Sequence, residues 1–204
     1  MADRDEWVPR TQLGKLVRSG EVTSIEQAQA MGLPILEPQI VEALVPDLKD
    51  EVLEVKPVQR TADSGRRTSF MVTVVIGDRR GHVGVGIGKA KEVRPAIERG
   101  IREAKRNITY VKRGCGSWEC RCGSEHSVNT RVYGRYSSVK IEIVPAPKGT
   151  GVVAGKTAKK VLEFAGIKDA WSRTFGNTGT VFNFANATLN ALRETCKSKK
   201  GRES

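Results

Sequence analysis

The chain has 204 residues, 38% of them hydrophobic and 5% aromatic, and its formal net charge is +12 at pH 7. This length predicts one or two domains, and the low aromatic content predicts a core made mainly of Val, Ile, Leu and Ala. Such a positive net charge favours an acidic partner such as nucleic acid. Each Lys or Arg that neutralises a phosphate releases a condensed counterion, which strengthens binding. No apolar run approaches the roughly 20 residues that span a bilayer. The polar N-terminus is unlike a secretory signal, so we expect a cytoplasmic protein.

Three short helices are predicted at the start of the chain. Thr11 can cap the first, which Gly20 ends, and Ser24 with Gln27 forms a capping-box pattern for the second. Pro38 can open the third. Because the first two helices, which belong to an N-terminal extension, carry little core of their own, we expect them to need a partner surface.

Residues 66–91 predict a β-hairpin with cationic ends. Its apolar runs, residues 70–76 and 82–87, are joined by a turn rich in Gly and Arg, and a polar loop is predicted at residues 59–67. Such ends suit a phosphate backbone better than a small substrate. The expected RNA-binding residues in this half of the chain and just beyond it are Arg60, Arg66, Arg67, Arg79, Arg80, Lys89, Lys91, Lys112 and Arg113.

A strand at residues 52–58 precedes the hairpin and a helix at residues 91–109 follows it. The helix is expected to bury one face, made of Val93, Ile97, Ile101, Ala104 and Ile108. The close glycines of residues 81–88 lie within a strand and not at a strand-to-helix turn. They therefore predict a bend or a close backbone approach to another chain, and not a dinucleotide fingerprint.

A second α+β part follows a Cys-rich loop. It contains a strand at residues 139–143, a Gly- and Pro-rich loop at 145–155, and helices at 157–165 and 181–192. The last helix has an apolar face for which we expect a protein partner. The predicted divisions are an N-terminal extension (1–37), an RNA-binding α+β domain (38–111), the Cys-rich loop (112–127), a C-terminal α+β domain (128–195) and a basic tail (196–204).

Residues 149–157 read GTGVVAGKT and come close to a phosphate-binding P-loop. That motif needs a Gly five residues before Gly155, where this chain has Thr150. With no nucleophile elbow elsewhere, we do not expect an enzyme. Instead, Lys148 or Lys156 can contact nucleic-acid phosphate together with backbone amides of this loop at a helix N-terminus.

A cluster of potential metal ligands lies in the Cys-rich loop. Three thiolates and an imidazole could close one tetrahedral zinc site, formed by Cys115, Cys120, Cys122 and His126. The spacing C-x4-C-x-C-x3-H is not that of a common zinc knuckle, so a flexible loop with reduced cysteines is the alternative. Trp118 is the one large apolar residue that could anchor the loop. One structural zinc ion and no organic cofactor are the expectation.

Several long phrases resemble the S-five family of small-subunit ribosomal proteins. These are RRTSFMVTVVIGDRRGHVGVGIGKAKEV, PAPKGTGVVAG and KKVLEFAGIKDAW, while EWVPRTQLGKLV and RGCGSWECRCG resemble the archaeal branch. The resemblance implies an α+β fold with an N-terminal domain like a double-stranded-RNA-binding domain and a C-terminal domain of the S-five type. It also implies that residues 60–67 match the family's basic loop, which inserts into ribosomal RNA.

The resemblance further implies a role and partners. Such proteins are structural constituents of the small ribosomal subunit and bind its rRNA, beside proteins of the S-four and S-eight families and close to S-three. They lie near the channel through which mRNA enters, support assembly and decoding accuracy, and are not enzymes. The alternatives are a free-standing RNA-binding regulator and a P-loop nucleotide-binding enzyme.

Overall fold

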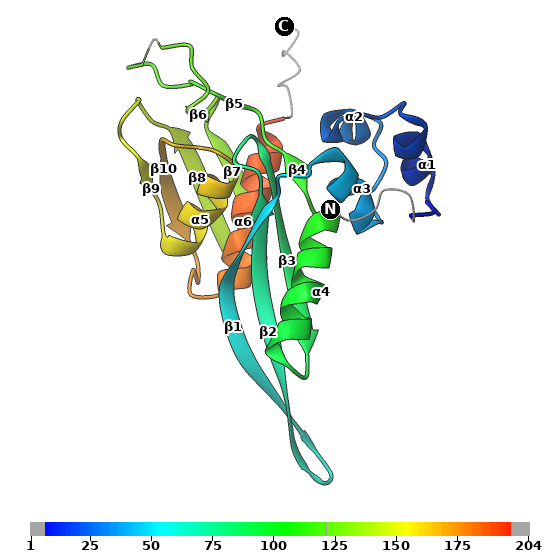
Figure 1. The fold of residues 1–204 in the computed structure, drawn as a ribbon. Coiled ribbons are helices and arrows are strands. Elements are labelled where there is room, and N and C mark those ends of the chain that lie inside the picture. The colour runs from blue at the N-terminus through cyan, green and yellow to red at the C-terminus, as the bar shows by residue number, and fades with distance from the viewer. Residues whose placement is uncertain (1–6, 121, 197–204) are drawn as a thin grey trace, which may run out of the picture. The chain divides into compact units, whose positions relative to one another are not determined.

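The computed structural model describes residues 7–120 and 122–196 (Figure 1). The chain divides into two compact units: one holds the chain up to Asp78 with Gly84–Thr109, the other Arg79–Val83 with the chain from Tyr110 onward. Each combines helices with β-strands, which confirms the α+β class. Among the described residues, every helix is too short or too polar to cross a membrane. The five predicted divisions stay a prediction, and the tail at residues 197–204 lies outside the described residues.

The first unit builds a sheet with the strand order β1-β2-β3-β4. Its strands are β1 (Lys49–Ala62), β2 (Gly65–Gly77), β3 (His82–Ala90) and β4 (Thr109–Tyr110). Its helices are α1 (Gln12–Ser19), α2 (Ile25–Ala30), α3 (Pro38–Leu44) and α4 (Val93–Arg106).

The short N-terminal helices begin at the residues that the sequence predicts. The Thr11 hydroxyl accepts the amide hydrogen bond that caps α1, and Gly20 ends the helix with a left-handed φ of 83°. Ser24 caps α2 by accepting from the Gln27 amide at 3.3 Å. Pro38 occupies the first turn of α3, where its missing N–H costs nothing. The three predicted helices are confirmed.

The expectation that the first two helices carry little core of their own is wrong. Leu13, Ile25 and Ile40 are almost fully buried in one apolar cluster that includes Val74 of β2 and Ala104 of α4. The apolar faces of α1, α2 and α3 are thus covered within their own unit. They need no partner protein to bury them.

The carboxylate of Glu37 ties the chain before α1 to the start of α3. Its Oε1 accepts from the amides of Arg10 and Thr11 at 2.9 and 2.8 Å, and its Oε2 accepts from the Trp7 indole at 2.9 Å. Burial acts to raise the pKa of Glu37, but these hydrogen bonds outweigh it and lower the pKa below its ordinary value. The charged form is therefore part of the folded structure.

Strands β1 and β2 run on as a two-stranded arm, defined here as residues 59–67, beyond the other strands of the sheet (Figure 1). The ladder continues to the pair of Ala62 with Gly65, so the turn consists of Asp63 and Ser64. The loop predicted for residues 59–67 is therefore wrong. Most arm residues are exposed, so the sequence lacks the apolar alternation that predicts a strand.

Glycines of β3 let helix α4 lie directly against the strand. A Cβ at Gly84 or Gly86 would overlap the backbone of Ala104, and one at Gly88 would overlap the carbonyl oxygen of Ala96. The close approach predicted from these glycines is thus to a helix of the same chain and not to another chain. Here glycine serves packing.

Helix α4 meets the sheet through small residues. Its buried residues are Ala96, Gly100 and Ala104, whereas Ile97 and Ile101 are only partly buried. Val93, which the periodicity assigns to the buried face, is 37% exposed. The predicted helix is confirmed, but its buried face is turned toward the small residues because β3 presents glycines to them.

The second unit contains a sheet with the order β7-β8-β10-β9 and a separate ribbon, β5-β6. Its strands are β5 (Arg113–Gly114), β6 (Ser127–Val128), β7 (Val132–Tyr136), β8 (Val139–Pro145), β9 (Val152–Val153) and β10 (Ala170–Phe175). Its helices are α5 (Lys156–Phe164) and α6 (Val181–Glu194). The segments 112–127 and 145–155, predicted as loops, therefore include short strands.

Helix α6 supplies much of the core of this unit. Phe184, Leu189 and Leu192 are buried, as are Ile141 and Ile143 of β8. The helix packs against β7, β8 and α5. The expectation that its apolar face needs a protein partner is wrong, because the sheet of the same unit covers that face.

Candidate metal centre and basic surfaces

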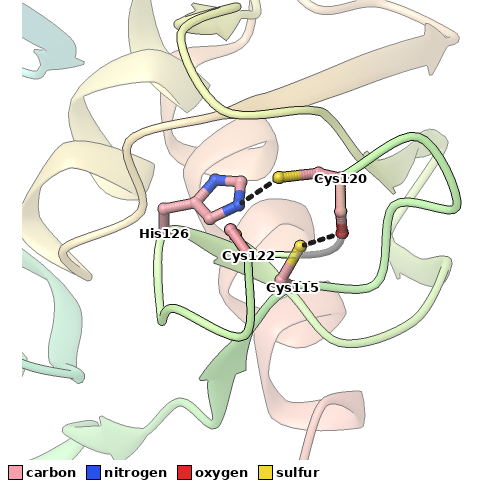
Figure 2. A group of neighbouring side chains, drawn as sticks. All are labelled: Cys115, Cys120, Cys122 and His126. Carbon is pink, nitrogen blue, oxygen red and sulfur yellow. Dashed lines mark hydrogen bonds between the residues drawn. The ribbon is translucent and has the colours of Figure 1, made fainter.

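The β5-β6 ribbon brings the two ends of the Cys-rich segment together. Gly114 pairs with Ser127, so Cys115, directly after β5, and His126, directly before β6, lie next to each other. Cys120 and Cys122 add two further thiols beside them (Figure 2). One ligand atom from each of four residues lies within 4.8 Å of all the others: Cys115, Cys120, Cys122 and His126. The structure thus brings together all four predicted ligands.

The separation of these atoms suits a shared metal ion. Zn–S bonds of about 2.3 Å and Zn–N bonds of about 2.0–2.1 Å place the sulfur and nitrogen of a tetrahedral site about 3.6 Å apart. Cys120 Sγ lies 3.7 Å from His126 Nε2. His126 is 5% exposed, and the thiols range from half-buried Cys115 and Cys120 to exposed Cys122. The chemistry and the spacing of the donor set therefore fit a closed, four-ligand site.

Two of the thiols have distinct surroundings. Cys115 Sγ donates to the carbonyl oxygen of Cys120 at 3.2 Å, and burial raises the pKa of Cys115. Cys122 Sγ lies 3.1 Å from the Ser124 hydroxyl, and hydrogen bonding by Ser124 lowers the pKa of Cys122 to about 6. A thiol with that pKa is largely thiolate at neutral pH, which is the form that binds metals.

The role expected for Trp118 is wrong. Its side chain is 88% exposed, so it does not anchor the Cys-rich loop through apolar burial. Glycine-rich segments lose much conformational entropy when they become ordered. The contacts that the loop's own side chains make are polar, such as those of Cys115, Cys120 and Cys122.

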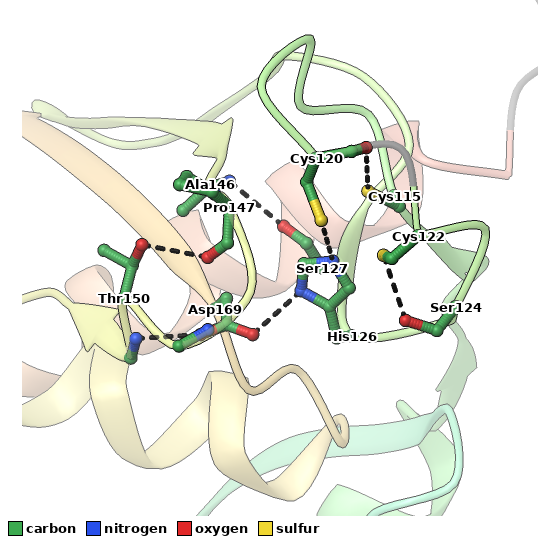
Figure 3. Close-up of polar contacts among 12 residues, drawn as sticks. Cys115, Cys120, Cys122, Ser124, His126, Ser127, Ala146, Pro147, Thr150 and Asp169 are labelled. Atoms are coloured by element: carbon green, nitrogen blue, oxygen red, sulfur yellow. Dashed lines mark hydrogen bonds and ion pairs between the residues drawn. The ribbon is translucent and has the colours of Figure 1, made fainter.

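Asp169 contacts His126 on the side away from the thiols (Figure 3). Its Oδ2 lies 2.8 Å from His126 Nδ1, and each side chain is 6% exposed. The two residues are 43 positions apart in the chain, and no motif joins them. Sequence reasoning therefore missed Asp169, which the turn after α5 delivers to the site.

The loop that resembles a P-loop holds a carboxylate. The amides of Gly149 and Gly151 donate to Asp169 Oδ1 at 3.0 and 2.8 Å. The phosphate contact predicted for the backbone amides of this loop is therefore wrong for these two, because a carboxylate already accepts them. Lys148 lies beside them and Lys156 begins α5; both are exposed, and their RNA contacts stay predictions.

The predicted RNA-binding arginines fall into two groups. Arg60, Arg66 and Arg67 are exposed on the arm. Arg79 and Arg80 are exposed in the turn after the other end of β2, where the Arg79 amide donates to Phe164 O at 3.0 Å. Both groups present charge to solvent, as phosphate contacts require.

The remaining predicted contacts lie at or next to the ends of strands. Lys89 is near the end of β3 and Lys91 follows it, and both are exposed. Lys112 is exposed before β5. Arg113 forms an ion pair with Glu125 at 3.2 Å, which offsets part of the charge it could offer to a phosphate.

Two family models match this chain. The model described as "Ribosomal protein S5, N-terminal domain" matches residues 48–112, and "Ribosomal protein S5, C-terminal domain" matches residues 134–202. Together they cover more than half of the chain. The chain belongs to the ribosomal protein S5 family. The metal ligands lie between the two matched ranges, so neither family model describes them.

Curated relatives agree with this assignment. The chain is 58% identical to "Small ribosomal subunit protein uS5" of Methanocaldococcus jannaschii, over 93% of this chain and 87% of that relative. It is 56% identical to the protein of the same name from Ignicoccus hospitalis, over 95% of this chain and 92% of that relative. It is 55% identical to the protein of that name from Staphylothermus marinus, over 95% of this chain and 90% of that relative. These archaeal S5 relatives confirm the predicted family and its archaeal type.

Proposed function

We propose that the chain is a structural constituent of the small ribosomal subunit, where it binds ribosomal RNA and neighbouring ribosomal proteins. Membership of the S5 family carries this proposal, because the match extends over both units. The S5 family is structural and non-enzymatic, and its proteins work in the cytoplasm within the ribosome. The net charge of +12 suits an RNA partner.

The arm is the RNA-binding element that we propose to be most important. Its exposed arginines Arg60, Arg66 and Arg67 stand on a narrow two-stranded projection, which can enter a space between RNA helices that a whole domain cannot. Phosphate contacts made there release counterions and therefore strengthen binding. Arg79, Arg80 and the exposed lysines would add contacts elsewhere on the surface.

Replacing two arginines of the arm tests this role. Arg66→Ala with Arg67→Ala is expected to lower incorporation of a tagged chain into small subunits severalfold, without unfolding the domain, because exposed charges add little to stability. Arg94→Ala with Arg102→Ala on α4 is the matched control, since it removes two exposed charges outside the proposed sites. Equal incorporation of both variants and the wild type would contradict a role for the arm.

Within the subunit, we propose a position near the channel through which mRNA enters, beside ribosomal proteins of the S-four and S-eight families and close to S-three. There the chain would support subunit assembly and decoding accuracy. The resemblance over nearly the whole chain supports this finer proposal. Cross-linking of intact subunits, read by mass spectrometry, should yield adducts to these three proteins; adducts to RNA alone would count against it.

We further propose that one structural zinc ion binds at Cys115, Cys120, Cys122 and His126. Soft thiolates and an imidazole are ligands that zinc prefers, and four protein ligands leave no open position for catalysis. The ion would stabilise a glycine-rich loop whose Trp118 is exposed, because the free energy of binding to a structural site becomes folding free energy.

Elemental analysis of the purified, chelator-washed protein tests the zinc proposal. One zinc per chain is expected for the wild type and well under one for Cys120→Ser. Cys196→Ser is the matched control: Cys196 is an exposed free thiol outside the cluster, so its loss should leave zinc content unchanged. Wild-type protein with little zinc would contradict the proposal.

A further inference from the structure

The pair of His126 and Asp169 defines which ring nitrogen faces the thiols. A carboxylate accepts hydrogen bonds and does not donate them, so at 2.8 Å from Oδ2 the Nδ1 atom carries the proton. The lone pair of a neutral imidazole then lies on Nε2, which is 3.7 Å from Cys120 Sγ. His126 is thus held in the one tautomer that can bind a metal on the side of the cysteines.

The same carboxylate organises the loop at residues 147–151. Its Oδ1 accepts from the amides of Gly149 and Gly151, whose positive φ values of 94° and 75° turn both N–H groups toward it. Between them, the amide and hydroxyl of Thr150 donate to Pro147 O at 3.3 and 2.9 Å and close the turn. One buried side chain therefore joins the metal ligand to a loop that is distant in the sequence (Figure 3).

Backbone contacts reinforce this junction. The carbonyl oxygen of His126 accepts from the amides of Lys168 and Asp169 at 2.9 and 3.1 Å. The Ser127 hydroxyl accepts from the Ala146 amide at 3.3 Å. Hydrogen bonds thus connect the start of β6, the end of β8 and the turn before β10 beside the ligand cluster.

Two alternative roles for the pair fit the structure less well. A thiol, an imidazole and a carboxylate in this order also resemble a nucleophile activated by a base. However, Cys120 shares its space with two more thiols, and the nearby amides of Gly149 and Gly151, which could have bound an oxyanion, donate to Asp169. A purely structural ion pair would not account for the placement of Nε2 among three sulfur atoms.

We infer that Asp169 is a positioning residue for the metal site and couples metal binding to the order of loop 147–151. This inference rests on the zinc site proposed above. Carboxylates that orient a metal-binding histidine typically change metal affinity by about 10–100-fold when they are replaced. Loss of the ion would release His126, and through Asp169 it would loosen Gly149 and Gly151 beside the exposed Lys148.

Asp169→Asn tests whether Asp169 orients His126, because the substitution changes the hydrogen bonding of the side chain but not its size. The asparagine oxygen can still accept from the amides of Gly149 and Gly151, which turns its NH2 group toward His126 Nδ1. An NH2 group donates, so it favours the tautomer with the proton on Nε2, which opposes metal binding. The variant keeps the size of the side chain and all four metal ligands, yet zinc affinity should fall about 10–100-fold.

Zinc affinity, measured by competition with a chromophoric chelator on the full chain, is the first readout. Glu142→Gln is the matched control, because Glu142 is another buried carboxylate of the same unit, paired with Arg131 and not with His126. Its zinc affinity should equal that of the wild type. Histidine 15N spectra give the tautomer directly, and with His82 as the only other histidine in the chain they are simple to assign.

Amide hydrogen exchange of wild-type protein is the second readout and needs no variant. Removing zinc should speed exchange at Gly149 and Gly151, and unchanged exchange would overturn the coupling even if Asp169→Asn failed to fold. If Asp169→Asn bound zinc as tightly as the wild type, with the same His126 tautomer, the positioning role would be overturned while the zinc site stood. A wild-type chain that bound no zinc would overturn both.

Discussion

Arg60 and Arg67 lie directly opposite each other across the β1-β2 ladder, near the end of the arm. The next pair outward joins Thr61 with Arg66. Like charges directly opposite each other destabilise a strand pair. The arm of the free protein therefore carries a repulsion that contact with a polyanion would relieve, which is a physical reason to expect RNA at this place.

Arg60→Thr should have opposite effects on the free arm and on RNA binding. Removing the repulsion should stabilise the arm by about 0.2–1 kcal/mol, seen as slower amide exchange at residues 59–67. Loss of one phosphate contact should also lower the slope of log K against log salt by about 0.7–0.9 for small-subunit rRNA. An unchanged slope would show that Arg60 does not contact phosphate.

Glu37 should make the N-terminal segment sensitive to acid. Its folded pKa is lowered from 4.5, so the hydrogen bonds to the charged carboxylate add stability above that value. This contribution should be lost as pH falls through the lower, folded pKa. Amide protection factors of Arg10 and Thr11, which donate to Glu37, should decline in that window. Glu37→Gln should abolish this pH dependence, and constant protection in the wild type would contradict this role of the carboxylate.

Gly88→Ala should destabilise the first unit. The added Cβ would overlap the carbonyl oxygen of Ala96 and the amide of Gly100, and backbone atoms of α4 cannot move aside as a side chain can. We expect a loss of at least about 1–3 kcal/mol in the free energy of unfolding, measured by urea denaturation. Gly155→Ala is the control: its Cβ would meet only the ring of Phe184, at 3.2 Å, so it should cost far less.

Trp118→Ala tests what orders the Cys-rich loop. Since this side chain is 88% exposed, its removal should change the free energy of unfolding by no more than about 0.5 kcal/mol. Limited proteolysis of the loop should likewise be unchanged while zinc is bound, and should accelerate in both proteins after chelation. Faster cleavage of the zinc-loaded variant alone would mean that Trp118, and not the metal, holds the loop.

Local signals made much of the fold predictable. The caps at Thr11 and Ser24 act through hydrogen bonds between residues a few positions apart, so the sequence carries the complete signal. Strand β8 was equally predictable from the sequence, because Val139, Ile141 and Ile143 alternate with other residues along it. The four metal ligands also lie within one short segment.

Features that depend on distant residues or on solvent exposure were not predictable in this way. The arm and β10 are largely exposed, so neither shows the alternation that identifies a strand. The buried face of α4 is set by the glycines of β3 and not by its own periodicity. Asp169 reaches His126 only through tertiary folding, so no spacing rule indicates it.

Fractionation of a cell lysate tests the central claim most directly. The lysate of the source organism would be separated on a sucrose gradient, and peptides of this chain would be quantified in every fraction by mass spectrometry. The S5 assignment predicts that nearly all of the chain sediments with small subunits and ribosomes, at about one copy per small subunit. A large pool in the free-protein fractions, with subunits that lack the chain, would contradict its role as a ribosomal constituent.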